Sequence, residues 1–253
     1  MRIPTNLAGA LAFAVAVHVA RFLLILAAIG IAPLIGVTGW YIGLFANVVC
    51  AVFAAILVSV LGLWRRSGMF RLWRSWTALL FLLPFVAEAL VWALVPDGLV
   101  FAEPGFGLWA LTLLLVGVNE ELTSRVVVLE TLRESFSLTP AVVMTAILFG
   151  LQHLSILATT PSRIDVVLVT VLLSTIAGFA MAAFQARFAW IWPLVLTHAT
   201  SDLTILMGAE APLWLEAAAH VMFVAVGILL LRNTRARLRA AGGDQATAGR
   251  DAD

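Results

Sequence analysis

Residues 106–132 read FGLWALTLLLVGVNEELTSRVVVLETL, a largely apolar stretch with a polar centre. A helix needs about 20 apolar residues to cross the hydrocarbon core of a bilayer, so this stretch is long enough to span one. Its centre, however, carries ionisable side chains between Asn119 and Arg125. Ionisable groups at bilayer depth cost at least a few kcal/mol each, so this cluster indicates either a functional interior or a paired structural charge.

The composition of the whole chain indicates a membrane protein. Of the 253 residues, 63% are hydrophobic and 11% are charged, and the mean hydropathy is +1.08. A soluble domain has about 45–50% apolar residues and about 25% charged residues. Such a chain has too little polar surface to cover itself in water, whereas lipid solvates apolar side chains. The composition therefore excludes a soluble globular protein and a disordered one.

Eight windows meet or approach the length of a membrane span, so we expect an all-α, polytopic fold with about eight transmembrane helices. The windows are 8–36, 40–64, 77–95, 106–132, 140–158, 166–185, 190–207 and 212–231. The first is long and contains His18 and Arg21, which we expect to snorkel or to face lipid headgroups. One interpretation of this window is an interfacial helix that leads into a shorter span.

The linkers between the windows are too short to separate soluble domains, which indicates a single membrane domain. Residues 1–105 would form the first three helices, and residues 106–231 would form a core that carries the polar motifs. Residues 232–253, rich in Ala, Gly, Arg and Asp, are predicted to be a disordered cytoplasmic tail.

The arginines predict the orientation, because cytoplasmic loops retain positive charge. All fifteen basic residues are Arg. With the N-terminus inside, twelve arginines fall on the inner side, and the outer loops hold only Arg163. The inner ones are Arg2, Arg65, Arg66, Arg71, Arg74, Arg133, Arg187, Arg232, Arg235, Arg237, Arg239 and Arg250. We therefore expect an integral protein of a cell's inner membrane with both termini in the cytoplasm, and nothing in this pattern favours nucleic acid.

Three predicted spans carry groups that could interact. On the fourth, Glu121 and Arg125 are four residues apart, which suits a salt bridge on one helix face, while Glu120 is left for another partner. The fifth carries Phe149-Gly150-Leu151-Gln152-His153. The seventh places His198 and Asp202 on one face.

These groups are predicted to lie at a similar depth in the membrane. At about 1.5 Å per residue, Glu120 lies roughly 18 Å above the cytoplasmic end of its span, and His153 roughly 20 Å. His198 and Asp202 lie at roughly 12 and 18 Å. We therefore expect a site enclosed by spans four, five and seven.

A buried carboxylate beside a neutral histidine can hold a water molecule and take its proton. A second imidazole can stabilise the oxyanion that forms when this water attacks an amide carbonyl. Two histidines and a carboxylate are also a common ligand set for a catalytic zinc ion, which acidifies its bound water directly. The residues thus indicate hydrolysis within the membrane and leave both a metal-free and a zinc-dependent scheme open.

The three motifs together resemble a known family. Glu-Glu-x-x-x-Arg at 120–125, Phe-x-x-x-His at 149–153 and His-x-x-x-Asp at 198–202 are similar to those of the CPBP intramembrane proteases. This family includes the type II CAAX prenyl endopeptidases and bacterial proteins linked to bacteriocin processing and immunity. The resemblance covers residues 106–207.

By this resemblance, Glu120 would activate water with the help of His153, and His198 and Asp202 would stabilise the oxyanion. The same four residues, Glu120, His153, His198 and Asp202, would be the ligands if one divalent metal ion, such as zinc, were bound. Glu121 and Arg125 would form a structural pair, and Phe149 would pack in the core. The substrate would be a membrane-associated protein or peptide.

The chain departs from the family pattern at two positions. Val126 stands where members often carry Gly, so local packing must differ. Asp202 stands where the motif frequently ends in Asn, and an ionised carboxylate would repel an oxyanion. Asp202 is therefore protonated, or binds a cation, or this member is catalytically altered.

Two other classes of function stay open. A proton- or ion-coupled transporter also uses intramembrane Glu, His and Asp, but it predicts broken helices or an internal repeat, and the sequence shows neither. A non-catalytic immunity or scaffold protein would keep the fold and bind a partner. Outside the motifs, Glu88 lies at comparable depth with a possible supporting role, and Glu216 and His220 are expected to satisfy each other.

Overall fold

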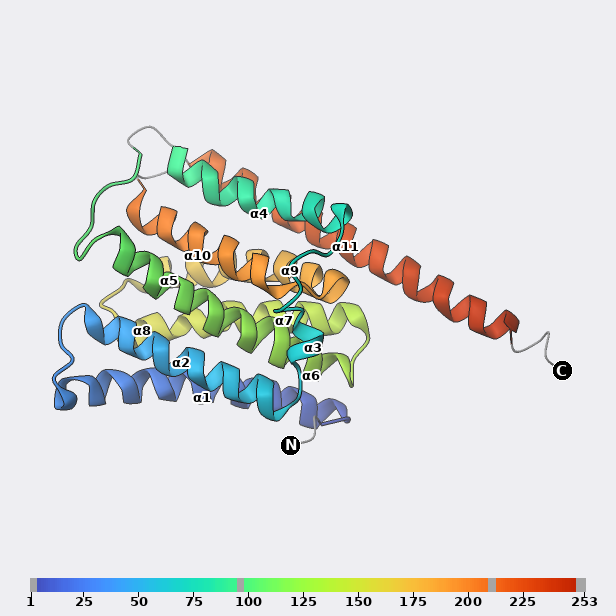
Figure 1. Ribbon diagram of the computed structural model, residues 1–253, viewed down its shortest axis with the longest axis horizontal. Helices are drawn as coiled ribbons and strands as arrows, with labels where there is room; N and C mark the ends of the chain where they lie inside the picture. The colour runs from blue at the N-terminus through green and yellow to red at the C-terminus, as the bar shows by residue number, and fades with distance from the viewer. Residues whose placement is uncertain (1–3, 95–97, 209–212, 249–253) are drawn as a thin grey trace.

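A computed structural model describes residues 4–94, 98–208 and 213–248 as a bundle of helices that run side by side (Figure 1). In the described part of the chain the only bridge of β type is an isolated one between Leu99 and Gly208. The long helices are α1 (Leu7–Ile31), α2 (Tyr41–Val60), α4 (Trp76–Leu94), α5 (Phe106–Glu121), α7 (Leu138–Leu151), α9 (Ile164–Phe188), α10 (Ile191–Met207) and α11 (Leu213–Ala248). Short helical segments join or extend them: η1 (Ala32–Ile35), α3 (Trp64–Ser67), η2 (Leu122–Val128), α6 (Leu129–Arg133), η3 (Gln152–Ser155) and α8 (Ile156–Thr159). The all-helical fold expected from the sequence is present.

Among the described residues, five helical stretches are long and apolar enough to cross a membrane. They are Leu7–Ile35, Tyr41–Val60, Leu138–Thr159, Ile164–Phe188 and Trp214–Arg235. Residues 106–133 are also helical, but this stretch carries Glu120, Glu121 and Arg125. Helix α10 has 17 residues, and the apolar stretch of α4, Trp76–Leu90, is also short. The chain is an integral membrane protein by these helices, and eight crossings stay a prediction.

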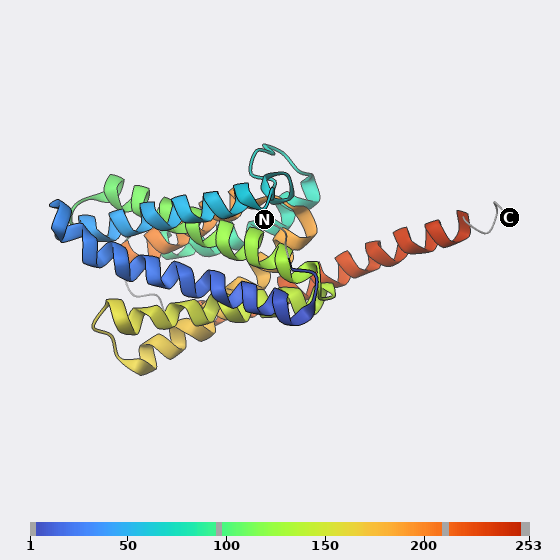
Figure 2. The same ribbon diagram turned by 90° about the horizontal axis from the view of Figure 1, so that it is seen from below.

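The structure differs from the sequence-based expectation at both ends. Helix α1 runs without a break over the first window and continues into η1, so no separate interfacial helix precedes a span. Helix α11 continues to Ala248 and projects beyond the bundle (Figure 2). Residues 232–248 are therefore helical where a disordered tail was expected, and residues 249–253 lie outside the described residues.

Helix α5 passes into α6 through seven residues of π-helix, η2, without leaving the helical path. Every residue of η2 is buried. Three consecutive β-branched valines, Val126 to Val128, occupy its second half, and β-branched side chains lose rotamer freedom against the preceding helical turn. Segments of π-helix inside α-helices occur frequently at functional sites. Here the π-helix begins directly after Glu120 and Glu121.

Close helix contacts at glycines pack the motif-carrying helices α5 and α7 against their neighbours. A Cβ atom on Gly117 of α5 would lie 2.7 Å from the carbonyl oxygen of Val195 on α10. A Cβ atom on Gly150 of α7 would lie 1.9 Å from Oγ1 of Thr175 on α9. Small residues at helix interfaces let backbones approach closely. Helix α5 therefore packs on α10, and α7 packs on α9.

The arginine-rich connections lie together at one end of the bundle. Arg66, Arg74, Arg133 and Arg187 line a common pocket there. The N-terminal segment reaches the same end, because Ser135 donates a hydrogen bond to the carbonyl oxygen of Pro4. Four of the twelve arginines expected to group on one side therefore lie together. Arg2 and Arg250 lie outside the described residues, and the side chains of Arg237 and Arg239 are not described. The side of the membrane on which this end lies stays a prediction.

Candidate active site

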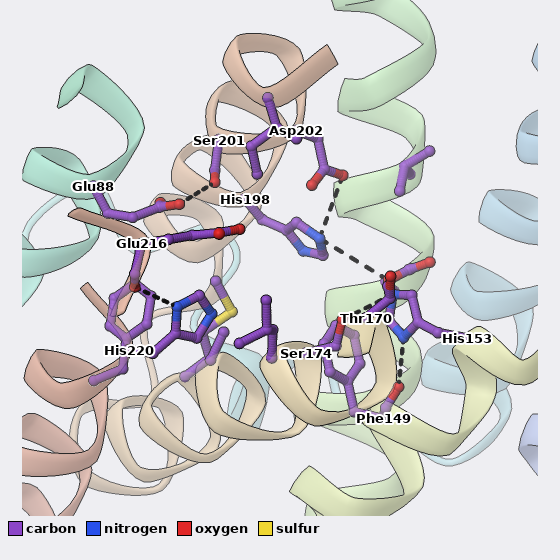
Figure 3. Close-up of a pocket in the computed structure, with 17 residues that line it drawn as sticks. Glu88, Phe149, His153, Thr170, Ser174, His198, Ser201, Asp202, Glu216 and His220 are labelled. Atoms are coloured by element: carbon purple, nitrogen blue, oxygen red, sulfur yellow. Dashed lines mark hydrogen bonds and ion pairs between the residues drawn. The ribbon is translucent and has the colours of Figure 1, made fainter. Parts of the chain in front are cut away.

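A cavity of about 420 Å³ lies between the helices that carry the three motifs (Figure 3). Its wall includes Glu120 from α5, His153 from η3, and His198 and Asp202 from α10. Helix α9 contributes Ser174. The structure therefore brings the four residues predicted to be catalytic to one cavity.

Glu121 and Arg125 form the buried pair that their spacing predicts. Oε2 of Glu121 lies 3.3 Å from Nε of Arg125, and neither side chain is exposed. The guanidinium of Arg125 lies over the ring of Phe149, with 3.7 Å from its central carbon to the ring centroid. A cation above an aromatic face is stabilised by the ring, and more so where both are desolvated. This stack links the first motif to the second.

His198 lies between carboxylates at the centre of the cluster. Its Nδ1 lies 3.0 Å from Oε1 of Glu121, and its Nε2 lies 3.5 Å from Oδ2 of Asp202. A carboxylate accepts hydrogen bonds, so the Nδ1 proton of His198 points at Glu121. Nε2 is therefore the nitrogen that faces the cavity.

His153 is oriented by the backbone of α7, the helix that precedes η3. Its Nδ1 lies 3.0 Å from the carbonyl oxygen of Phe149. A carbonyl can only accept, so Nδ1 carries the proton and Nε2 of the neutral ring keeps a lone pair. Nε2 lies 3.4 Å from Oγ of Ser174. This arrangement leaves His153 able to accept a proton or a hydrogen bond on the cavity side.

Both carboxylate oxygens of Glu120 accept hydrogen bonds. Its Oε1 accepts a hydrogen bond of 2.7 Å from Nη2 of Arg21, and its Oε2 accepts one of 2.9 Å from Nε2 of Gln152. The same Oε2 lies 4.0 Å from Nε2 of His198, which is too far for a direct hydrogen bond. Glu120 and His198 thus keep capacity for a group placed between them.

Arg21 is the site residue that sequence analysis misplaced. The expectation that it snorkels toward a headgroup is wrong, because its side chain is only 7% exposed and forms an ion pair with Glu120. The depth of Arg21 along α1 could have identified it as a site residue. Arg21 lies fourteen residues beyond the start of α1 at Leu7, or roughly 21 Å along the helix, close to the depth calculated for Glu120. Gln152, beside His153, was likewise not identified as a site residue.

A second polar group lines the far side of the cavity. Ser201 donates a hydrogen bond of 2.8 Å to Oε1 of Glu88 on α4. Nδ1 of His220 lies 2.8 Å from the backbone carbonyl oxygen of Glu216, and both residues line the cavity. His220 thus contacts the backbone of Glu216 where contact between the two side chains was expected. Residues of α4 and α11, which carry none of the three motifs, therefore also line the cavity.

The four predicted metal ligands are not arranged as a metal site among the described residues. In the described portion of the chain, no three His, Cys, Asp or Glu side chains are grouped so that they could hold one. Glu120 already has an arginine and an amide as partners. As they are placed, Glu120, His153, His198 and Asp202 do not fit a zinc site.

Comparison with known proteins identifies the part of the chain that carries this site. Residues 101–204 match the family model described as type II CAAX prenyl endopeptidase, Rce1-like. The matched region contains all three motifs. No curated protein and no solved structure matches the chain.

Proposed function

We propose that this member of the CPBP family is an intramembrane endopeptidase that hydrolyses a peptide bond of a membrane-associated protein or peptide. The family is a protease family, which supports proteolysis. The observation that carries the proposal is the placement of Glu120 and His198 on one cavity wall, with 4.0 Å between Oε2 and Nε2. A water molecule or a substrate carbonyl placed there would reach both groups.

In the proposed reaction, Glu120 takes a proton from a water molecule while the water oxygen attacks the carbonyl carbon of the scissile bond. The negative charge that develops on the carbonyl oxygen is stabilised by a proton on Nε2 of His198. When the tetrahedral intermediate collapses, the carbon–nitrogen bond breaks and the leaving amine takes the proton from Glu120. His153 assists by accepting a hydrogen bond from the attacking water.

Glu121 and Asp202 support this role of His198. Glu121 holds the Nδ1 proton and thereby orients the ring. Asp202 lies 3.5 Å from Nε2, so its negative charge is offset by a protonated ring when an oxyanion is present. This arrangement offers a physical reason why an aspartate can occupy a position where the family frequently has asparagine.

The test is cleavage of a panel of membrane-anchored reporter peptides by the purified full-length protein in liposomes. We expect Glu120→Gln, His153→Asn and His198→Asn each to lower kcat by at least about 10²-fold, which is typical for loss of an acid–base group. Asp165→Asn is the matched control, because Asp165 is exposed and pairs with Arg163 away from the cavity. The control should cleave like the wild type.

Two results would contradict the proposal. If the wild type cleaves no reporter in a broad panel, the alternative of a non-catalytic immunity or scaffold protein is favoured. If cleavage is absent while the liposomes show proton or ion flux that depends on Glu120, the transporter alternative is favoured.

A further inference from the structure

Arg21 of α1 donates hydrogen bonds into the motif cluster. Its guanidinium makes three contacts: Nη2 with Glu120 at 2.7 Å, Nε with Oδ1 of Asn119 at 2.7 Å, and Nη1 with Oε1 of Gln152 at 3.5 Å. Each of the three partners lies on α5 or η3, about a hundred or more residues later in the chain. A planar guanidinium held at three nitrogens has little freedom to move.

The contacts close into a ring around the Glu120 carboxylate. Gln152 accepts from Arg21 through Oε1 and donates to Oε2 of Glu120 through Nε2. Arg21 holds the other oxygen, Oε1. Both oxygens are therefore fixed from outside the cavity, and the carboxylate is held in one orientation with Oε2 nearest to His198.

Helix α2 contacts this ring of hydrogen bonds through Asn119. Asn119 donates from Nδ2 to Oδ1 of Asn47 at 3.1 Å, while its own Oδ1 accepts from Arg21. Asn119 is fully buried. Nδ2 of Asn119 also donates to the carbonyl oxygen of Leu115 at 3.0 Å. The amide orientation that Arg21 requires is thus favoured by α2 together with the backbone of α5.

Arg21 and Asn47 lie outside residues 101–204, the part of the chain that matches the family model. From these contacts we infer that Arg21 is a positioning residue for Glu120, so that the N-terminal helices complete the active site rather than only enclose it. The inference rests on the proposed function. It adds a residue whose loss should lower the rate of the chemical step without weakening substrate binding.

A simpler interpretation is that Arg21 and Glu120 form an ion pair that only stabilises the fold. Both the positioning role and the structural ion pair predict that loss of Arg21 affects folding, because a buried carboxylate would lose its counter-charge. Only the positioning role predicts a change in kcat, with little change in KM, in protein that is still folded. The conservative variant separates them: lysine keeps the positive charge but loses the planar fork that contacts Asn119 and Glu120 together.

The experiment compares Arg21→Met, Arg21→Lys and Glu120→Gln with the wild type in the liposome cleavage assay. Arg163→Met is the matched control, since Arg163 also pairs with a carboxylate but at an exposed position. Folding of each variant is checked by its thermal transition in detergent, and kcat and KM are measured separately.

We expect Arg21→Met to lower kcat by about 10²-fold, the scale for misplacing a catalytic group by about 1 Å, with KM within about twofold. Arg21→Lys should lie between this variant and the wild type, and Arg163→Met should be unchanged. If Arg21→Met does not fold, Arg21→Lys alone carries the test, with an expected loss of about tenfold in kcat.

A folded Arg21→Met or Arg21→Lys with wild-type or increased kcat would overturn the inference, and so would a change confined to KM. Glu120→Gln separates this failure from that of the proposed function. If Glu120→Gln cleaves like the wild type, the assignment of Glu120 as the base is wrong. If it is inactive while both Arg21 variants are fully active, only the positioning role is wrong.

Discussion

Nδ1 of His198 lies 3.0 Å from Oε1 of Glu121, although the two residues are 77 positions apart in the chain. The second oxygen of Glu121 lies 3.3 Å from Nε of Arg125. One fully buried carboxylate thus orients a histidine at the cavity and balances a fully buried arginine. The first and third motifs are joined through this single side chain.

Glu121→Gln should lower the free energy of unfolding by about 3–5 kcal/mol, because Arg125 would be left as an uncompensated buried charge. The glutamine amide oxygen can still accept from His198, so the loss reports mainly on the ion pair. The measurement is denaturant unfolding in detergent micelles.

The matched control for this prediction is Glu134→Gln. Glu134 pairs with Arg66 at the end of the bundle, where the arginine side chain is 53% exposed, and exposed pairs contribute about 0.2–1 kcal/mol. Arg125→Met combined with Glu121→Gln should recover part of the lost stability. Equal stability of Glu121→Gln and the wild type would mean that Arg125 is solvated or paired differently.

Asp202→Asn should retain activity within about tenfold of the wild type, whereas Asp202→Ala should lose at least about 10²-fold. The asparagine oxygen can accept from Nε2 of His198, and a neutral amide does not repel an oxyanion. The measurement is kcat in the liposome assay. If Asp202→Asn is as inactive as Asp202→Ala, the negative charge at this position is required for cleavage.

Gly150→Ala should destabilise the protein by about 1–3 kcal/mol, because its Cβ would overlap Thr175 and the backbone of Val171. Gly43→Ala on α2 is the control. No atom beyond the backbone of α2 around it lies within 4 Å of a Cβ at Gly43, and alanine there favours the helix by up to about 1 kcal/mol. Thermal unfolding of both variants checks the pair, and a similar shift in both would argue against close packing of α7 on α9.

A metal chelator should leave cleavage activity unchanged, because the predicted ligands share a cavity but are not grouped as a metal site among the described residues. Elemental analysis of the active protein should find no zinc in stoichiometric amount. A stoichiometric metal whose removal abolishes cleavage, and whose return restores it, would instead favour the zinc-dependent scheme that the sequence left open.

Much of the candidate site could be anticipated from local patterns. The spacing of Glu121 and Arg125 predicted their ion pair, since residues four apart share a helix face. Depth along each helix indicated that Glu120, His153 and His198 could meet. Such estimates use only the rise per residue and the order of the spans, so they do not depend on how the helices are arranged around the cavity.

Contacts between distant helices could not be derived in this way. Arg21 was expected to reach a headgroup because a single arginine in an apolar helix usually does so when no partner is known. Its partners, Asn119, Glu120 and Gln152, lie 98 to 131 residues away. The rotation of α1 about its axis determines which helix Arg21 faces, and hydropathy carries little information on that rotation in a helix that is apolar on nearly all sides.

The sequence by itself indicated that this protein lies in lipid and that it is helical. It also identified the side chains that are candidates for the reaction. Composition requires lipid, window length predicts helices, and three short motifs indicate the chemistry, because each depends on residues close together in the chain. Only the tertiary structure decided how Glu120 is held and that Glu121 contacts both Arg125 and His198. Those contacts depend on the packing of α1, α5, α7 and α10, in which small residues at close contacts and buried charges select one arrangement among many that satisfy the same local pattern.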